Sequence, residues 1–139
     1  PMSLTSTQIV LVRDSFATIR ENLAPPSARF YETLFSHAPE LRPMFRDDLE
    51  GQGMRFMTTL SLMVDHLDAP DALAARFDEL GRSHKALGVR LAHFVPMEEA
   101  LVDTLRDRIG DAMTPETEAA WRAAYRDLVD EIVARGNLH

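Results

Sequence analysis

His84 is the residue of this sequence whose type and position could do chemistry. It continues a stripe of apolar side chains, Leu73, Phe77 and Leu80, at steps of four, three and four residues, which is the spacing of one helix face. A neutral imidazole can ligate iron or zinc, whereas a core histidine with a hydrogen-bond partner is the commoner explanation of such a position. Residue type and spacing alone leave both explanations open.

The other four histidines do not form a metal cage with His84. His37 precedes a proline turn, His66 lies near a predicted helix end, His93 falls outside the apolar stripe by its spacing, and His139 is the last residue. No His-Glu-x-x-His motif or helical carboxylate cluster is present, so zinc and di-iron sites fit poorly. A porphyrin supplies four donors itself, so a lone histidine on an apolar wall fits an axial haem ligand best among metal sites.

Two polar residues elsewhere could complete a site around a bound ligand. Tyr31 sits among phenylalanines and a leucine, where a buried hydroxyl needs a partner. Gln52 precedes Phe56 by one helical turn, so the two project from the same helix face. Each also has an ordinary explanation, as a core tyrosine and a first-turn glutamine. Their spacing does not show that either one meets His84.

The elements that must position these residues are all predicted to be helices. Apolar residues recur at helical spacing through nearly the whole chain, and no segment alternates as a strand does. Thr5 and Gln8 form a capping-box pattern, and Thr114-Pro115-Glu116 is a strong helix start. The predicted segments are 6–21, a second helix from Pro25 through Phe35, a short turn at 39–45, a loop at 46–51, and helices at 52–67, from about 71 to near Gly88, 94–110 and from 115 to just before Gly136.

These segments predict one all-α domain of six or seven helices covering residues 1–139. The composition, 45% hydrophobic and 27% charged, is that of an ordinary globular protein, and the net charge of −7 argues against a nucleic-acid partner. No apolar run is long enough to span a membrane, and the N-terminus lacks a secretion signal. The absence of cysteine excludes disulfides and thiolate ligands. A cytoplasmic location is the simplest expectation.

Four stretches in register resemble a known family over nearly the whole chain. The family is that of bacterial single-domain haemoglobins of the Vitreoscilla type, which are similar to the globin domain of flavohaemoglobins. The resemblance implies a globin fold around haem b. The stretches are Phe30-Tyr31-Glu32-Thr33-Leu34-Phe35, Pro39-Glu40-Leu41-Arg42-Pro43-Met44-Phe45, Leu80-Gly81-Arg82-Ser83-His84 with Gly88-Val89, and Ala120-Trp121-Arg122-Ala123-Ala124-Tyr125.

The resemblance also implies roles for nine residues of this chain. His84 matches the proximal iron ligand, and Tyr31 and Gln52 match a distal pair that donates hydrogen bonds to bound gas. The remaining matches are Phe45, which packs flat on the porphyrin, Phe56 over the iron, Leu80, Val89 and Phe94 as proximal haem contacts, and Arg55 as a propionate partner.

The sequence departs from flavohaemoglobins in three respects. Phe94 stands where that family has a tyrosine, and Gly136 stands where it has a glutamate that supports the proximal histidine. Because the sequence ends at His139, we also expect no reductase of the kind that follows the globin domain in flavohaemoglobins. An anionic partner would make the imidazole more electron-donating, so its loss disfavours peroxidase-like chemistry.

The expected function is therefore reversible binding of dioxygen or another diatomic gas, by a monomer or homodimer, rather than catalysis. Nitric oxide dioxygenation with a separate reductase is the alternative. A sensor module, a haem-free structural globin and a four-helix metal bundle fit less well.

Overall fold

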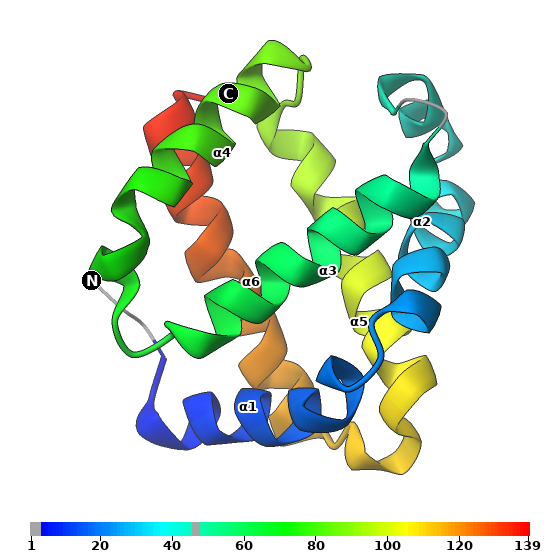
Figure 1. Cartoon of the computed structure of the whole chain (residues 1–139), viewed down its shortest axis with the longest axis vertical. Coiled ribbons are helices and arrows are strands. Elements are labelled where there is room, and N and C mark those ends of the chain that lie inside the picture. The colour runs from blue at the N-terminus through cyan, green and yellow to red at the C-terminus, as the bar shows by residue number, and fades with distance from the viewer. Residues whose placement is uncertain (1–3, 46–47) are drawn as a thin grey trace.

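The described part of the chain is helical. The computed structural model describes residues 4–45 and 48–139, and within them it contains six α-helices and four short 3₁₀ helices and no strand (Figure 1). The predicted all-α fold is confirmed. The elements are α1 (Ser6–Arg20), α2 (Ala24–His37), η1 (Pro39–Met44), α3 (Leu49–Asp65), η2 (Pro70–Leu73), α4 (Ala74–Ala86), η3 (Leu91–His93), α5 (Phe94–Ile109), η4 (Gly110–Ala112) and α6 (Pro115–Gly136).

Local sequence signals explain where several helices begin. The Thr5 hydroxyl accepts from the Gln8 backbone N–H at 3.1 Å, and the Gln8 side chain accepts from the Thr5 N–H at 3.0 Å, which is the predicted capping box. Thr114 caps α6 by accepting from the Thr117 N–H at 3.2 Å. A proline occupies the first turn of both α2 and α6, where its missing N–H costs no hydrogen bond.

The start of α3 differs from the prediction. Residues 46–51 were expected to form a loop, but α3 begins at Leu49, because the Asp48 carboxylate caps it by accepting from the Gly51 N–H at 3.0 Å. Residues 46 and 47 lie outside the described residues. The helix also ends at Asp65, two residues earlier than predicted.

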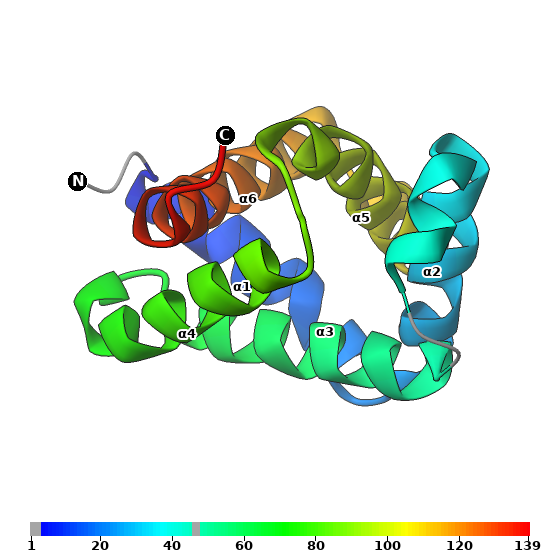
Figure 2. The same cartoon turned by 90° about the horizontal axis from the view of Figure 1, so that it is seen from above.

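The helices pack in two layers. In the view from above, α3 and α4 form one layer, α5 and α6 form the other, and α2 lies at one side between them (Figure 2). The α1 helix runs across one end of the molecule (Figure 1). Trp121 of α6 is fully buried and its Nε1–H donates to Ser15 Oγ of α1 at 2.8 Å, so the largest core side chain also joins two helices.

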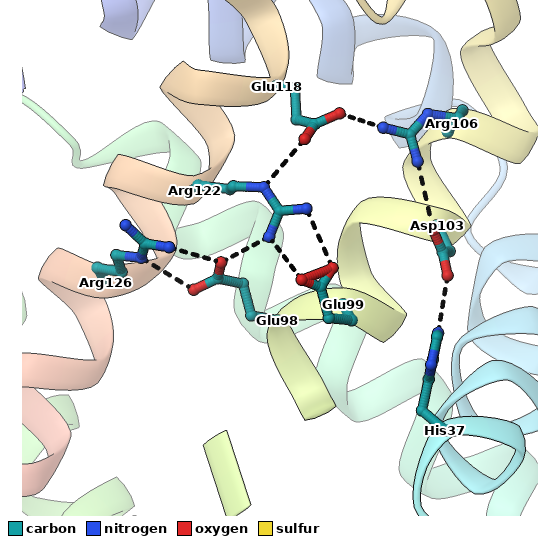
Figure 3. Close-up of polar contacts among 8 residues, drawn as sticks. All are labelled: His37, Glu98, Glu99, Asp103, Arg106, Glu118, Arg122 and Arg126. Atoms are coloured by element: carbon teal, nitrogen blue, oxygen red, sulfur yellow. Dashed lines mark hydrogen bonds and ion pairs between the residues drawn. The ribbon is translucent and has the colours of Figure 1, made fainter. Parts of the chain in front are cut away.

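A network of ion pairs joins the outer faces of α5 and α6 (Figure 3). Arg122 binds Glu98 at 2.7 Å and Glu99 at 3.0 Å, and Arg126 binds Glu98 at 3.1 Å. Burial raises the pKa of Glu98, but hydrogen bonds from both arginines outweigh burial and hold that pKa below its ordinary value.

No helix among the described residues is long and apolar enough to cross a membrane.

Candidate functional site

A cavity of about 550 Å³ lies between the two layers, a volume typical of sites for small molecules and cofactors. Side chains from α2 to α6 and from the connections η1 and η3 line it, and most of them are apolar. All nine residues singled out in the sequence analysis are among these lining residues: Tyr31, Phe45, Gln52, Arg55, Phe56, Leu80, His84, Val89 and Phe94. The fold therefore brings together residues that lie 63 positions apart in the sequence.

His84 reaches the cavity from the last turn of α4. Its Nδ1 lies 2.6 Å from the Leu80 carbonyl oxygen, one turn earlier in the same helix. A carbonyl only accepts, so Nδ1 carries the proton and the neutral ring keeps the lone pair on Nε2. No partner for Nε2 occurs among residues 4–45 and 48–139. The imidazole is thus oriented by one backbone hydrogen bond and offers one free donor atom for a metal.

The Tyr31 hydroxyl of α2 is a second unpaired polar group at the cavity. Tyr31 is 8% exposed, and its hydroxyl makes no hydrogen bond to any described residue. Burial raises the pKa of Tyr31 to about 12, and the nearby Arg55 guanidinium opposes that rise. The hydroxyl therefore stays protonated at neutral pH and is available as a donor. The Gln52 amide of α3 lines the same cavity without a side-chain partner in the described structure.

The close crossing of α2 and α3 brings Tyr31 and Gln52 to one cavity. A Cβ atom on Gly53 would lie only 2.7 Å from the Ser27 carbonyl oxygen, so the two helix backbones touch at this point. Gly53 directly follows Gln52, and Ser27 precedes Tyr31 by about one helical turn. A glycine at the crossing thus determines how near the two polar side chains come.

Aromatic rings pack around Tyr31 at the cavity wall. Phe56 stacks on Phe30 with centroids 4.0 Å apart, and Phe45 meets the Tyr31 ring edge-on at 5.0 Å. Such contacts fix ring orientation beyond what apolar burial alone does. Phe45 and Phe56 are half-buried and line the cavity, so each presents part of its ring to whatever the cavity binds.

Aromatic residues of α5 and α6 also line the cavity. The Phe94 ring lies 5.9 Å from the His84 ring with 25° between their planes. The buried Tyr125 hydroxyl donates to the Phe94 carbonyl at 2.8 Å. Burial raises the pKa of Tyr125, and Glu98 adds to the rise, so this hydroxyl also remains a donor. Phe94 has no hydroxyl that could bond to His84. The tyrosine that α6 supplies here, Tyr125, donates to the Phe94 backbone and not to His84.

Sequence reasoning missed His93, which lines the cavity from η3. Its Nδ1 accepts from the Arg90 N–H at 2.9 Å, so the neutral ring carries its proton on Nε2. His93 lies off the α4 stripe, as its spacing indicated, but the turn between α4 and α5 returns it to the cavity. No periodicity within one helix carries that signal.

Arg76 and Thr59 were missed for the same reason. Arg76 Nη2 donates to Thr59 Oγ1 at 3.2 Å, while its buried Nε has no partner among the described residues. Three other lining residues, Met97, Leu128 and Ile132, lie on apolar stripes of α5 and α6 that were visible in the sequence. Assigning them to the cavity rather than to the core required the packing of the helices.

The residues of the cavity fit a haem. No group of three or more His, Asp or Glu side chains able to hold a metal ion occurs in the described parts of the chain. One imidazole with a free Nε2 suffices when a planar macrocycle brings the other four donors. The apolar walls suit the porphyrin ring, and the cations Arg55 and Arg76 at the lining suit its two carboxylates.

Comparison with known proteins identifies the family. The globin family profile matches residues 28–132, which cover most of the helices and every residue of the candidate site. The chain therefore belongs to the globin family. Its predicted similarity to the globin domains of flavohaemoglobins is confirmed by the relatives that follow.

Among these relatives, a flavohemoprotein of Bordetella pertussis is 27% identical over 128 residues, which are 90% of this chain and 32% of that protein. The chain thus spans about a third of the length of the flavohemoproteins it matches. A leghemoglobin of Medicago sativa is 29% identical over 94% of this chain and 97% of its own length.

A solved structure from Rhodothermus marinus is an engineered carbene transferase and a proposed nitric oxide dioxygenase. It has a TM-score of 0.89 at 27% identity and covers 97% of this chain and 94% of its own. A hexacoordinated haem protein from a tardigrade has a TM-score of 0.87 at 21% identity, with 98% of this chain and 97% of the other covered, and shows the shared fold.

Proposed function

We propose that this chain binds haem b in the cavity, with His84 Nε2 as the proximal iron ligand. The observation that carries the proposal is the state of the His84 ring: Nδ1–H is engaged by the Leu80 carbonyl and Nε2 is left free at an apolar cavity. That hydrogen bond selects the tautomer a ligand needs and limits rotation of the ring. The leghemoglobin among the relatives supports haem binding.

We further propose that the bound haem reversibly binds dioxygen or another diatomic gas. A haem held by His84 would supply an iron centre able to take up such a gas. Tyr31 and Gln52 would donate hydrogen bonds to the gas from the side of α2 and α3, since both side chains lack other partners in the described structure. A donor to a charged acceptor contributes about 1.5–3 kcal/mol, so these residues favour slow release of dioxygen.

The proximal side favours binding over oxygen activation. The acceptor for His84 Nδ1–H is a neutral backbone carbonyl. The resemblance to flavohaemoglobins implies a glutamate where this chain has Gly136. A neutral acceptor pulls less on the imidazole proton than a carboxylate does, so the ring donates less electron density. Storage, delivery or scavenging of dioxygen, in the cytoplasm, is therefore the favoured role.

The test is haem titration of the purified protein and of His84→Ala, followed by absorption spectra of the ferric, ferrous and gas-bound states. We expect one haem per chain, a five-coordinate ferrous spectrum that changes on gas binding, and at least about a tenfold loss of haem affinity in His84→Ala. Gln8→Ala, a substitution on α1 away from the cavity, is the control. Unchanged haem affinity in His84→Ala would refute the ligand assignment.

Nitric oxide dioxygenation is a second candidate, favoured by the likeness to the Rhodothermus marinus protein, which is a proposed enzyme of this kind. The reaction consumes nitric oxide, dioxygen and one electron and gives nitrate, so turnover requires a reductase as electron donor. Stopped-flow mixing of dioxygen-loaded protein with nitric oxide, followed by re-reduction with cell extract, tests it. Stoichiometric nitrate without any re-reduction would leave gas binding as the function.

A further inference from the structure

We infer that the backbone contact between Gly81 of α4 and Gly136 of α6 positions His84, because it fixes the peptide that orients the imidazole. The inference rests on the proposed function in one respect: His84 must be the haem ligand for the contact to affect a bound haem. It concerns two residues that touch neither the cavity nor any ligand, so they are positioning residues.

The two helices meet here without any side chain between them. A Cβ atom on Gly136 would lie 2.6 Å from the Gly81 carbonyl oxygen and 2.8 Å from its Cα. A Cβ on Gly81 would lie 2.6 Å from the Gly136 nitrogen. Both glycines are buried. Any larger residue at either position must separate α4 from α6, because the atoms it would meet belong to backbone and cannot rotate away.

The contact involves the residue that follows the Leu80 carbonyl, the group that orients His84. The Leu80 carbonyl, which accepts the His84 Nδ1–H at 2.6 Å, belongs to the planar peptide unit that ends at the Gly81 nitrogen and Cα. When α6 fixes Gly81, it therefore also fixes the position of the Leu80 carbonyl. His84 follows Gly81 by three residues, within the same helical turn.

No other hydrogen bond holds the His84 ring within the described residues. The ring also lies beside the Phe94 ring, and the Phe94 carbonyl accepts a hydrogen bond from Tyr125 of α6. The orientation of the imidazole thus depends on a single carbonyl and on the helix that carries it. In flavohaemoglobins the residue at the Gly136 position is expected to act on the histidine through a carboxylate, whereas here α6 acts through the backbone of α4.

The test compares Gly136→Ala with the unmodified haem-loaded protein by two spectroscopic readouts. Solvent exchange of the His84 Nδ1–H is measured by NMR in the carbon monoxide complex, and the iron–histidine stretching frequency is measured by resonance Raman in the ferrous form. We expect exchange to become up to about tenfold faster, the factor for loss of one neutral hydrogen bond, and the stretching frequency to shift. Gly81→Ala should do the same from the α4 side.

Two controls separate positioning from general destabilisation. Gly110→Ala places the same methyl group at a left-handed position (φ 57°) outside the cavity lining, and it should leave both His84 signals unchanged while lowering stability. Arg135→Ala removes the ion pair from Arg135 to Asp78 of α4, 2.9 Å long, without adding atoms between the helices, and should also leave the signals unchanged.

A folded Gly136→Ala with both signals unchanged would overturn the inference. If neither glycine variant folds, the unmodified protein still decides: slowly exchanging Nδ1–H supports the Leu80 hydrogen bond, and fast exchange overturns it. Failure of the proposed function gives a different result: if His84 is not the haem ligand, His84→Ala keeps its haem affinity.

Discussion

Two tyrosine hydroxyls that line the cavity show how position changes the role of one residue type. Tyr31 and Tyr125 are the two tyrosines of the chain, and both are buried. Tyr125 donates to the Phe94 carbonyl, so its hydroxyl is already satisfied. The Tyr31 hydroxyl has no partner in the described structure, which is a cost that a bound ligand can offset.

Tyr31→Phe should therefore release dioxygen about ten- to a hundredfold faster, because it removes a donor to the bound gas. Stopped-flow displacement of dioxygen by carbon monoxide measures the rate. Tyr125→Phe is the matched substitution: it should lower the free energy of unfolding by about 1 kcal/mol and change the release rate much less. Equal release rates in the unmodified protein and Tyr31→Phe would show that Tyr31 is not the donor.

The raised pKa of Tyr31, about 12, also predicts how release depends on pH. Below that value the phenol is protonated and can donate, so dioxygen release should stay constant from about pH 7 to 10. A raised pKa in the folded state means that its contribution to stability is complete below the unfolded pKa near 10 and is lost as the pH rises toward 12. A release rate that climbs between pH 7 and 9 would contradict this assignment of the donor.

At the scale of the elements, helix crossings decide which side chains meet. At the Gly53 crossing, α2 and α3 approach as backbones, which places Tyr31 and Gln52 at the same cavity. Ion pairs also join helices: Arg122 and Arg126 of α6 both bind Glu98 of α5 (Figure 3).

Gly53→Ala should destabilise the fold by about 1–3 kcal/mol, because the methyl group forces α2 and α3 apart. Helix propensity alone predicts the opposite sign, a gain of about 1 kcal/mol. Urea unfolding of the haem-loaded protein distinguishes the two. A more stable variant would show that α2 and α3 can move apart at little cost in free energy, contrary to this prediction.

Glu98→Gln should remove part of the acid sensitivity of the protein. The folded-state pKa of Glu98 is lowered, so its stabilising effect is complete above the ordinary carboxyl pKa and is lost as the pH falls through the folded-state value. At pH 7 the variant should be less stable by about 1–2 kcal/mol, with the difference shrinking below about pH 4. Unfolding free energies at pH 7 and at successively lower pH provide the measurement. A difference that is constant over this range would contradict it.

The sequence predicted the helices better than it predicted their meeting points. Capping residues and apolar stripes are local, and they located α1, α5 and α6 to within a residue or two. The start of α3 was misplaced because polar residues at 46–51 obscured the cap at Asp48.

The candidate site followed the same division. Its nine residues were proposed from motifs and all line the cavity, yet their distances to one another were not predictable. His93 and the Gly81–Gly136 contact depend on how distant segments pack, which no spacing encodes.

For the whole molecule, haem should act as part of the core. The cavity lies between the two helix layers, so filling it joins all of the surrounding helices. A ligand that binds only the folded state stabilises it by mass action, by about 2.7 kcal/mol at a hundredfold excess over its dissociation constant. Thermal unfolding with and without added haem should show a higher midpoint with haem, and a smaller rise for His84→Ala. Equal midpoints would show that haem does not bind this cavity.

The end of α6 has a practical consequence for anyone who joins this chain to another protein. Leu138 is buried, and the His139 carbonyl accepts from the Leu91 N–H at 3.2 Å, beside residues 89 and 93 of the cavity lining. A reporter or affinity tag attached after His139 would thus emerge next to the cavity rather than away from it. A short rigid fusion there would strain the α4–α5 connection, so a flexible spacer is the sounder design.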